Sequence, residues 1–339
     1  MHPLEAIRNS KSLLAKHLTP ELWESLSPLL SPGGFSLEEQ IASGIANPDS
    51  AVGIYLKEGE AYHSLAPLLH PIIADYHGLI PHDQPRGFPP AGALSLKDSQ
   101  ERIQTSRIRV ARNLAGHSFV GGMSLFERLE LEAEVKDVLA QLDGPLQGTY
   151  RSLKDISPDE QLALRAKSHL FQEPDRFLTA GGLAQDWPEG RGIFANKDHS
   201  FMVWVGEEDH LRVMTLLKGN SLDRAASLLE QGLAQLGQGL NFSFDPELGY
   251  LSSCPSNLGT GMRAGVHLRL PEWEAKGDLF KTEAQRLGLQ LRGTGGEHTQ
   301  AKGSVYDLSN LRRLGVSEAE ILQGLVKGLE FFLDEDQWK

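Results

Sequence analysis

The segment from Cys254 to His267 contains the side chains of this chain that are best suited to chemistry. It holds the only cysteine of the sequence, then a turn with two glycines, then Arg263 at the start of an alternating strand. A thiolate needs a polar or positive neighbour, and the Ser256 hydroxyl is close enough in sequence to donate to it. Glycines let backbone N–H groups approach an anion, and an arginine can hold phosphate oxygens through two hydrogen bonds. A small buried hydrophobe is the other common role of a free cysteine.

Two predicted strands carry basic side chains on one face. In the first, alternation places Arg107 and Arg109 on one side of the strand and apolar residues on the other. In the second, the same alternation places Arg263, His267 and Arg269 together. Neighbouring arginines repel one another unless an anion or carboxylates lie between them. One such strand is often only a solvated face with surface ion pairs, but two in an acidic protein favour phosphate binding.

Three acids, Glu207, Glu208 and Asp209, directly follow a short apolar strand, and Arg212 comes soon after them. Adjacent acids at a strand end are often a solvated loop, yet such loops also carry function. A carboxylate here can bind a guanidinium in fork geometry, hold it for attack and accept its proton. His210, in the same stretch, is assigned no role.

Arg292 opens a glycine-rich stretch that ends at Glu297. Three glycines in four positions predict a loop that can close over a ligand, although an ordinary glycine turn has the same composition. The stretch lacks the Gly-Lys-Ser/Thr ending of a P-loop. On closure, the arginine would reach a phosphate and the glutamate a guanidinium.

Composition narrows the classes of function. The 339-residue chain has 33 Lys and Arg against 45 Asp and Glu, a net charge of −12, which disfavours general binding to nucleic acids or anionic membranes. A single cysteine excludes intrachain disulfides and cysteine-based zinc clusters and fits a reducing compartment. The N-terminus does not have the pattern of a signal peptide, and no apolar run reaches the ~20 residues of a membrane span. We therefore expect a cytoplasmic protein.

The pattern of elements predicts an α+β protein of two domains. The first, residues 1–84, is expected to be all-α, with helix starts at Thr19 and Ser36. A stretch rich in proline and glycine, 85–100, is expected to link it to the second domain, 101–339. In that domain, Ser317 is expected to cap a long C-terminal helix with Glu320 in a capping box. The segments with the clearest patterns are strands at 103–111, 201–205 and 263–270, and helices at 125–142, 210–218 and 222–236.

The order of these motifs resembles that of the phosphagen (guanidino) kinases. The run Cys254–Thr260 resembles that family's signature most specifically, and 187–194 and 203–212 resemble further family segments in the same order. The resemblance covers nearly the whole chain. It implies a small all-α N-terminal domain and a larger domain with a mostly antiparallel β-sheet flanked by helices, the glutamine-synthetase-like catalytic fold. It also implies transfer of the γ-phosphoryl group of ATP to a guanidinium nitrogen.

The resemblance assigns roles to individual residues. Arg107, Arg109, Arg212, Arg263 and Arg292 match the arginines that hold the nucleotide phosphates. His267 matches a histidine near the adenine and ribose. Glu207 and Asp209 match acids near Mg²⁺, through water, with the ion itself on the ATP phosphates. The residues implied at the nucleotide are Thr105, Ser106, Arg107, Ile108, Arg109, Arg212, Arg263, Ala264, Gly265, Val266, His267, Arg292, Gly293, Thr294, Gly295, Gly296 and Glu297.

The catalytic residues implied by the resemblance are Glu208, Glu297 and Cys254, which also contact the acceptor. The loop Ser50, Ala51, Val52, Gly53, Ile54 and Tyr55 resembles the short specificity loop of arginine kinases, and Glu297 matches their second glutamate. L-arginine is therefore the favoured acceptor.

The sequence departs from the family pattern at two positions, the first of which bears on nucleotide affinity and the second on the acceptor. Ala195 stands where the family usually has a histidine near the nucleotide, and Gly295 replaces an arginine common in arginine kinases. Taurocyamine, glycocyamine, lombricine, creatine and protein arginine remain alternatives, as does a relative without catalysis. Family members occur as monomers and as homodimers, and nothing in the sequence decides between them.

Overall fold

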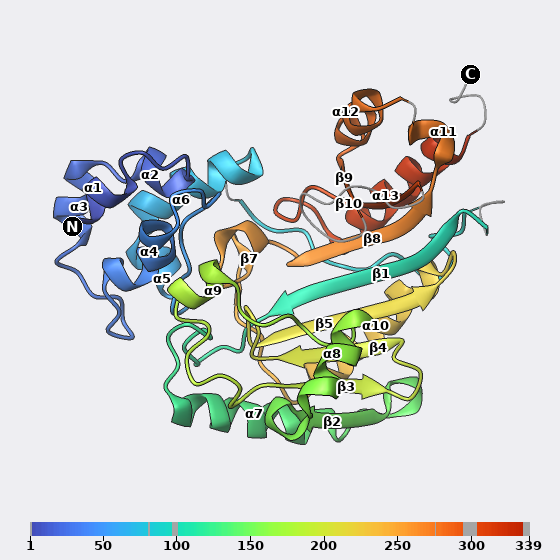
Figure 1. Cartoon of the computed structure of the whole chain (residues 1–339), viewed down its shortest axis with the longest axis horizontal. Helices are drawn as coiled ribbons and strands as arrows, with labels where there is room; N and C mark the ends of the chain where they lie inside the picture. Colours follow the sequence, from blue (N-terminus) through green and yellow to red (C-terminus); the bar gives the residue numbers. More distant parts are fainter. Residues whose placement is uncertain (1, 81, 97–100, 275, 294–303, 335–339) are drawn as a thin grey trace.

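The computed structural model describes residues 2–80, 82–96, 101–274, 276–293 and 304–334. Short helices gather in the N-terminal part, and a large sheet with helices around it forms most of the rest (Figure 1). The N-terminal helices are α1 (Pro3–Ile7), α2 (Leu13–His17), α3 (Pro20–Leu26), α4 (Leu37–Ala46), α5 (Ala61–Ser64) and α6 (Ala66–His77). The predicted fold class, α+β with a small N-terminal helical part, is confirmed.

Helices begin where the sequence provides caps. The Thr19 hydroxyl accepts a hydrogen bond from the backbone N–H of Leu22 at 3.2 Å, and Pro20 is the first residue of α3. Ser36 and Glu39 form a reciprocal capping box on α4. Both predicted helix starts in this part of the chain are confirmed.

Within the described residues, eight strands form one sheet in the order β2-β3-β4-β5-β1-β8-β10-β9, and every neighbouring pair is antiparallel. A separate hairpin pairs β6 (Phe244–Asp245) with β7 (Gly249–Tyr250). The strands of the large sheet are β1 (Ile103–Arg112), β2 (Gly148–Ser152), β3 (Gly192–Asn196), β4 (Phe201–Val205), β5 (Leu211–Lys218), β8 (Met262–Arg269), β9 (Leu289–Gly293) and β10 (Val305–Asn310).

The helix predicted for residues 210–218 is wrong, because this segment is strand β5. Gly206, with a φ of +73°, opens the tight turn that joins it to β4 as an antiparallel hairpin. The run of apolar residues is compatible with either helix or strand, so pairing with β4 and β1 decides its conformation. Leu211, Val213, Thr215 and Leu217 are buried on one face of the strand, and Met214 is buried on the other.

The two faces of the sheet are covered differently. One face lies under α7 (Leu125–Leu139), α10 (Leu222–Leu236) and α13 (Glu318–Leu333), and their apolar side chains form the main core with the sheet. The other face has a small apolar cluster at the β3–β5 end, under the chain around 153–171. The rest of that face is therefore available to polar side chains. The remaining helices are α8 (Pro158–Ala166), α9 (Arg176–Ala180), α11 (Pro271–Glu274) and α12 (Asp278–Arg286).

The N-terminal helices share an apolar core with the larger part of the molecule. Leu251, Cys254 and Leu258 pack into the same cluster as the buried side chains of α4 and α6. The backbone N–H of Leu56 also donates to the carbonyl of Ser253 at 2.8 Å. This junction brings the segment that follows the predicted specificity loop against the cysteine-bearing turn.

Within the described residues, no helix combines the length and the apolar character that crossing a membrane requires.

Replacing Ser317 with Ala is expected to lower the free energy of unfolding by about 1 kcal/mol, the usual effect of losing an N-cap. Ser317 accepts from the backbone N–H of Glu320 at 3.2 Å, and the helix that it caps packs into the main core. Ser157→Ala is the matched control, because Ser157 caps α8, which buries no residue. Its loss should be clearly smaller, since a helix that frays locally contributes little to global stability. Urea unfolding measures both, and equal losses would contradict this interpretation.

Candidate active site

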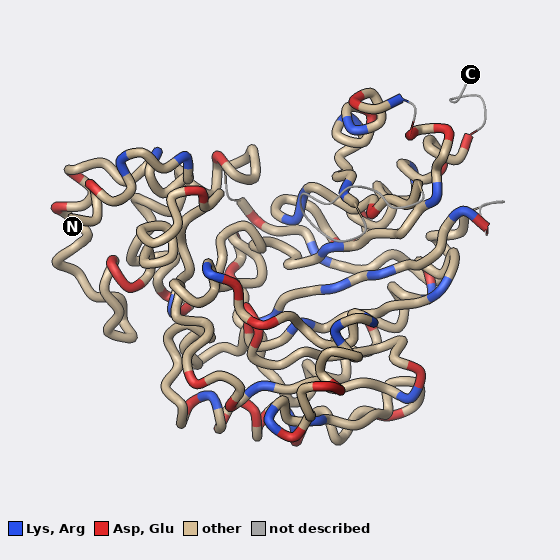
Figure 2. Tube along the Cα trace, viewed as in Figure 1, with Lys and Arg blue, Asp and Glu red and all other residues tan. Residues whose placement is uncertain are grey.

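Arginines from adjacent strands meet on the less covered face of the sheet. Ile108 and Val110 are fully buried in the main core, so Arg107 and Arg109 point to the opposite face. The register pairs Arg109 of β1 directly with Arg263 of β8. Like charges in directly opposed positions destabilise a sheet, so this pairing indicates an anion-binding site. Basic positions recur along the central strands (Figure 2).

A cavity of about 320 Å³ gathers the predicted arginines. They come from β1, β5, β8 and β9, which are far apart in sequence but close together in the sheet. Among the described residues, the lining consists of Arg107, Arg109, Ser168, Leu170, Gln172, Trp204, Glu207, Arg212, Arg263, Arg292 and Asp307. All five arginines expected at the phosphates therefore line one cavity.

The electrostatics of this cavity are unfavourable without an anion. Burial is the largest cause that lowers the pKa of the Arg109 guanidinium, and Arg212, Arg107 and Arg263 lower it further. Burial likewise lowers the pKa of Arg107, partly offset by Asp307. Each guanidinium stays charged at neutral pH, so the cluster holds repelling cations that a polyanion would stabilise.

Asp307 is the counter-charge that the sequence analysis missed. It lies on β10, where it is paired with His267 of β8 on one side and Arg292 of β9 on the other. Its Oδ2 is 2.9 Å from Nη2 of Arg263 and 3.7 Å from Nη2 of Arg107. An isolated acid within an otherwise uncharged strand was the available signal, but its meaning depends on which strands pair.

Glu207 and Glu208 lie on the turn between β4 and β5, where they meet Arg212. Glu207 binds Arg212 through two oxygens, at 3.0 and 2.8 Å. Glu208 is 3.4 Å from Arg212 through one oxygen and 3.4 Å from the Asn257 amide through the other. Burial, and then the nearby Asp209 and Glu207, raise the pKa of Glu208. This carboxylate therefore favours a protonated state more than an exposed glutamate does, unless a cation binds beside it.

Asp209 and His210 serve the interior of the protein. One Asp209 oxygen accepts from the Asn113 amide and from the backbone N–H of Ser253, both at 2.7 Å, and the residue is 4% exposed. His210 accepts at Nδ1 from the Leu114 backbone at 3.0 Å, which leaves Nε2 to donate to the Ser118 carbonyl at 2.8 Å. Burial lowers the pKa of His210 to about 3, so the ring is neutral. Asp209 does not line the arginine cavity, whereas Glu207 does.

Cys254 is a neutral thiol in the free protein. Its sulfur is 3.1 Å from the Ser256 hydroxyl, the contact expected from the sequence. That contact lowers the pKa, but burial and then the negative charge of Glu208 outweigh it and raise the pKa to about 12. Ser256 thus acts on the pKa in the expected direction, but burial and Glu208 keep Cys254 neutral in the free protein. A cation beside Cys254 and Glu208 would stabilise both negative forms.

The predicted specificity loop is held firmly and ends beside this cysteine. The Ala51 and Val52 carbonyls accept from the backbone N–H groups of Leu13 and Leu14 at 2.9 and 3.0 Å. Burial raises the pKa of Tyr55, and the negative forms of Cys254 and Glu208 raise it further. The phenol ring therefore lies within electrostatic range of both groups.

The other predicted residues divide into three groups. Ile108, Ala264 and Val266 belong to the main core, so only their backbones can serve a ligand on the arginine face. The Ser106 hydroxyl donates to the Gly219 carbonyl at 2.9 Å and so supports a turn. Thr105 and Gly265 lie beside His267 and Arg107 in the β1–β8 pairing, and Arg292 and Gly293 end strand β9. Residues outside the described part of the chain are Thr294, Gly295, Gly296 and Glu297.

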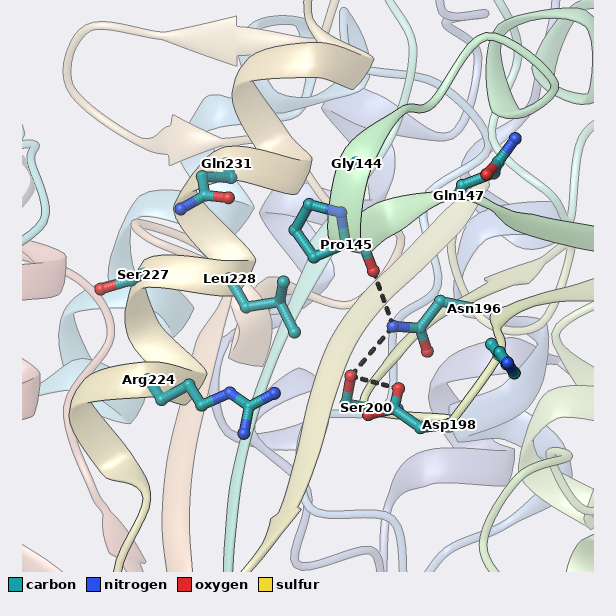
Figure 3. A pocket seen from close by; sticks show the side chains of 11 residues that line it. Gly144, Pro145, Gln147, Asn196, Asp198, Ser200, Arg224, Ser227, Leu228 and Gln231 are labelled. Carbon is teal, nitrogen blue, oxygen red and sulfur yellow. Dashed lines mark hydrogen bonds between the residues drawn. The ribbon is translucent and has the colours of Figure 1, made fainter.

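A second cavity, of about 650 Å³, lies between α10 and the turn that joins β3 to β4 (Figure 3). Its buried polar groups already pair with one another, since the Asn196 amide donates to the Pro145 carbonyl and to the Ser200 hydroxyl, both at 2.9 Å. Its two cations, Lys197 and Arg224, are exposed. Its described lining residues include none of those predicted to do chemistry, so the arginine cavity is the candidate active site.

Comparison with known proteins gives the same result as the geometry. The C-terminal catalytic domain of the ATP:guanido phosphotransferases matches residues 130–337, and the N-terminal domain of that family matches residues 8–74. An arginine kinase of Liolophura japonica is 42% identical over 327 residues, which are 95% of this chain and 93% of that enzyme.

Two solved structures are also similar. The substrate-free duplicated taurocyamine kinase of Schistosoma mansoni superposes with a TM-score of 0.91 at 33% identity, covering 97% of this chain. This chain spans 48% of that duplicated protein. A lombricine kinase superposes with a TM-score of 0.90 at 32% identity, covering 99% of this chain and 96% of its own. The chain thus belongs to the ATP:guanido phosphotransferase family, the phosphagen kinases, and it is an ATP-dependent phosphotransferase.

Replacing Glu208 with Gln is expected to stabilise the free protein at pH 8 more than at pH 5. Because the folded state raises the pKa of Glu208, it holds this proton to higher pH than the unfolded chain does. The bound proton therefore adds to the free energy of unfolding below the unfolded pKa, and this stabilisation is lost as pH rises through the folded pKa. Glutamine cannot ionise, so the variant does not lose this stabilisation. The stabilisation is about 1 kcal/mol for each unit by which the folded pKa exceeds the unfolded one.

Urea unfolding at both pH values measures this difference. Glu330→Gln, on an exposed face of α13, is the control and should show no such trend. If Glu208→Gln were less stable relative to the parent at pH 8 than at pH 5, the raised pKa would be refuted.

Proposed function

We propose that this protein catalyses the reversible transfer of the γ-phosphoryl group of ATP to the guanidinium of L-arginine, giving phosphoarginine and ADP. One observation carries the proposal. Five arginines from four strands line one cavity, whose edge is formed by Glu207 on the turn that also bears Glu208. The arginines can bind a polyphosphate, and the adjacent carboxylates can bind a guanidinium.

In this proposal Arg107, Arg109, Arg212, Arg263 and Arg292 bind the phosphates of ATP. Asp307 would then give up part of its contact with Arg263 and Arg107 to the nucleotide. His267, next to Asp307 across β8 and β10, would lie near the adenine and ribose. Charge neutralisation and alignment supply most of the rate in phosphoryl transfer, which requires little covalent help from the protein.

We place Mg²⁺ on the phosphates of ATP. This ion keeps several waters and commonly binds to substrate phosphates, so in this proposal its ligands are phosphate oxygens and water. Glu207 lines the cavity and can reach such an ion through water, whereas the Asp209 oxygen is committed to Asn113 and Ser253. When bound, Mg²⁺ would neutralise phosphate charge.

Glu208 and Cys254 would hold the acceptor. The Glu208 carboxylate orients the guanidinium, and its raised pKa suits it to accept the proton that the attacking nitrogen loses. The N–P bond forms as the P–O bond to ADP breaks. The guanidinium charge in turn favours the negative forms of both protein groups. We propose that Glu297 provides a second carboxylate to the acceptor.

The short specificity loop and the relatives support arginine as the acceptor. Tyr55 ends this loop beside Cys254 and Glu208, and it can offer a hydroxyl to the amino-acid part of the acceptor. The arginine kinase relative is 42% identical over nearly the whole chain. The taurocyamine and lombricine kinases are 33% and 32% identical, and they favour testing their own acceptors as second candidates.

We also propose the division into an N-terminal domain of residues 1–84, a linker of 85–100 and a catalytic domain of 101–339. Separate family models for 8–74 and 130–337 support it. The single cysteine supports a cytoplasmic location. The oligomeric state, monomer or homodimer, is to be measured by sedimentation.

The acceptor is tested by coupled measurement of ADP release from Mg-ATP with a panel of acceptors. We expect turnover on L-arginine to exceed that on taurocyamine, glycocyamine, lombricine, creatine and an arginine-containing protein. Faster turnover on another acceptor would keep the phosphoryl-transfer site but overturn the argument from the loop and Glu297. ATP binding with no turnover on any acceptor would overturn the proposed function.

Replacing Arg263 with Ala is expected to lower kcat/KM by about 100-fold or more, because one donor to the developing charge is lost. The variant should also bind tripolyphosphate more weakly by calorimetry, which tests the phosphate site without turnover. Arg269→Ala is the control, since Arg269 is on the same strand but exposed and outside the cavity. A change below threefold in kcat/KM for Arg263→Ala would show that this arginine does not touch the phosphates.

A further inference from the structure

Lys57 is a buried lysine that the proposed reaction does not use. It lies two residues after Tyr55, and it is 5% exposed. Its ammonium donates a hydrogen bond to the carbonyl of Gly181, in the turn that follows α9. Within the described part of the chain it forms no ion pair. Burial lowers the pKa of Lys57 to about 8, so the lysine is still mostly charged at neutral pH. Glu39 offsets the cost of burying this charge only at longer range than an ion pair, which points to a specific use of the position of Lys57.

The backbone around this ammonium is built from glycines that leave room for it. A methyl group at Gly121 would lie 3.0 Å from Nζ of Lys57 and 2.8 Å from the Gly181 carbonyl oxygen. A methyl group at Gly182 would also lie 3.0 Å from Nζ. The ammonium therefore lies between two backbone segments, 121–122 and 181–182. Only glycine allows these segments to approach the lysine so closely.

Gly181 connects Lys57 to the acceptor side of the active site. A methyl group at Gly181 would lie 2.9 Å from Cδ2 and 3.2 Å from Cγ of Tyr55, so the backbone of this glycine packs directly on the tyrosine ring. Its carbonyl is the group that Lys57 holds. The hydrogen bond from Lys57 to Gly181 thus holds the turn at 181–182 against the tyrosine ring.

Other side chains from the N-terminal part hold the beginning of the same segment. The Ser43 hydroxyl donates to the Phe177 carbonyl at 2.9 Å, and the Asn47 amide donates to the Arg176 carbonyl at 3.4 Å. Ser43 lies on α4 and Asn47 caps the C-terminus of that helix, and both side chains reach α9. Lys57 donates to the far end of this segment, at Gly181, which is the residue that contacts Tyr55.

We propose that Lys57 is a positioning residue for the acceptor: by holding the Gly181 carbonyl it fixes the Tyr55 ring beside Glu208 and Cys254, and it thereby sets the affinity for the guanidino compound. This inference rests on the proposed function, since it assigns Tyr55 to the acceptor. Lys57 touches no reacting atom, and the nucleotide arginines lie on other elements. Its loss therefore acts on the acceptor alone.

The kinetic test compares Lys57→Met with the parent protein. Methionine has nearly the same length but cannot donate, so the acceptor KM is expected to rise about tenfold through displacement of Tyr55, while kcat and the KM for Mg-ATP change less than twofold. Lys16→Met is the control, because Lys16 is an exposed lysine of the same N-terminal part, paired with Asp75. An unchanged acceptor KM, or an equal rise in the KM for Mg-ATP, would overturn the proposal.

A second variant reaches Tyr55 from the other side. Gly181→Ala keeps Lys57 but puts a methyl group against the ring, so it should raise the acceptor KM in the same way. In a Tyr55→Ala background, Lys57→Met should have almost no further effect on the acceptor KM, because residues that act through one another are not additive. Full additivity would show that Lys57 does not act through Tyr55.

Hydrogen exchange tests the contact without any acceptor. Backbone amides in 176–183 are expected to exchange several-fold faster in Lys57→Met than in the parent or in Lys16→Met. Unchanged exchange would overturn the role of Lys57 whatever the enzyme phosphorylates. Failure of the parent protein to phosphorylate any guanidino compound would instead overturn the proposed function and the acceptor assignment, while faster exchange would still establish the contact. These two failures are therefore distinguishable.

Discussion

The active site depends on holding like charges together on one face of a sheet. Arg109 and Arg263 are directly opposed on β1 and β8, a pairing that repulsion disfavours. The fold enforces it because the alternate residues, such as Ile108 and Ala264, are buried in the main core on the other face. A shift of one residue in either strand would bury arginines and expose that core, so hydrophobic burial fixes the register against the electrostatic cost.

Two opposite electrostatic deficits lie side by side in the free protein. On one side, burial and the neighbouring arginines lower the pKa of Arg109, and Glu207 offsets this only in part. On the other side, burial and neighbouring acids raise the pKa of Glu208, which in turn helps to keep Cys254 a neutral thiol. A bound polyanion would stabilise the charged arginines, and a bound guanidinium would stabilise the negative forms of Glu208 and Cys254. Arg212, bound to Glu207 and Glu208, lies where the two halves meet.

The acceptor side is assembled across the junction between the helical part and the sheet. The loop that ends at Tyr55 is anchored to α2 and α4 by backbone hydrogen bonds, and the segment after it contacts the chain next to Cys254. Lys57 ties this same segment to the turn after α9. Acceptor recognition is therefore a property of contacts between distant parts of the chain, whereas phosphate recognition is a property of the sheet.

The helix caps at Thr19, Ser36 and Ser317 could be predicted from the sequence because they follow from local hydrogen bonding. The strand faces that bear Arg107, Arg109 and Arg263 could be predicted because they follow from a period of two. The signature around Cys254 identified the family. Residues 211–218 could not be assigned in this way, because their apolar run fits a helix or a strand and pairing with β1 and β4 selects the strand. Asp307 and Lys57 acquire their meaning in the same way. One faces two arginines and the other a glycine carbonyl, all far away in sequence, and such contacts leave no periodic trace in the chain.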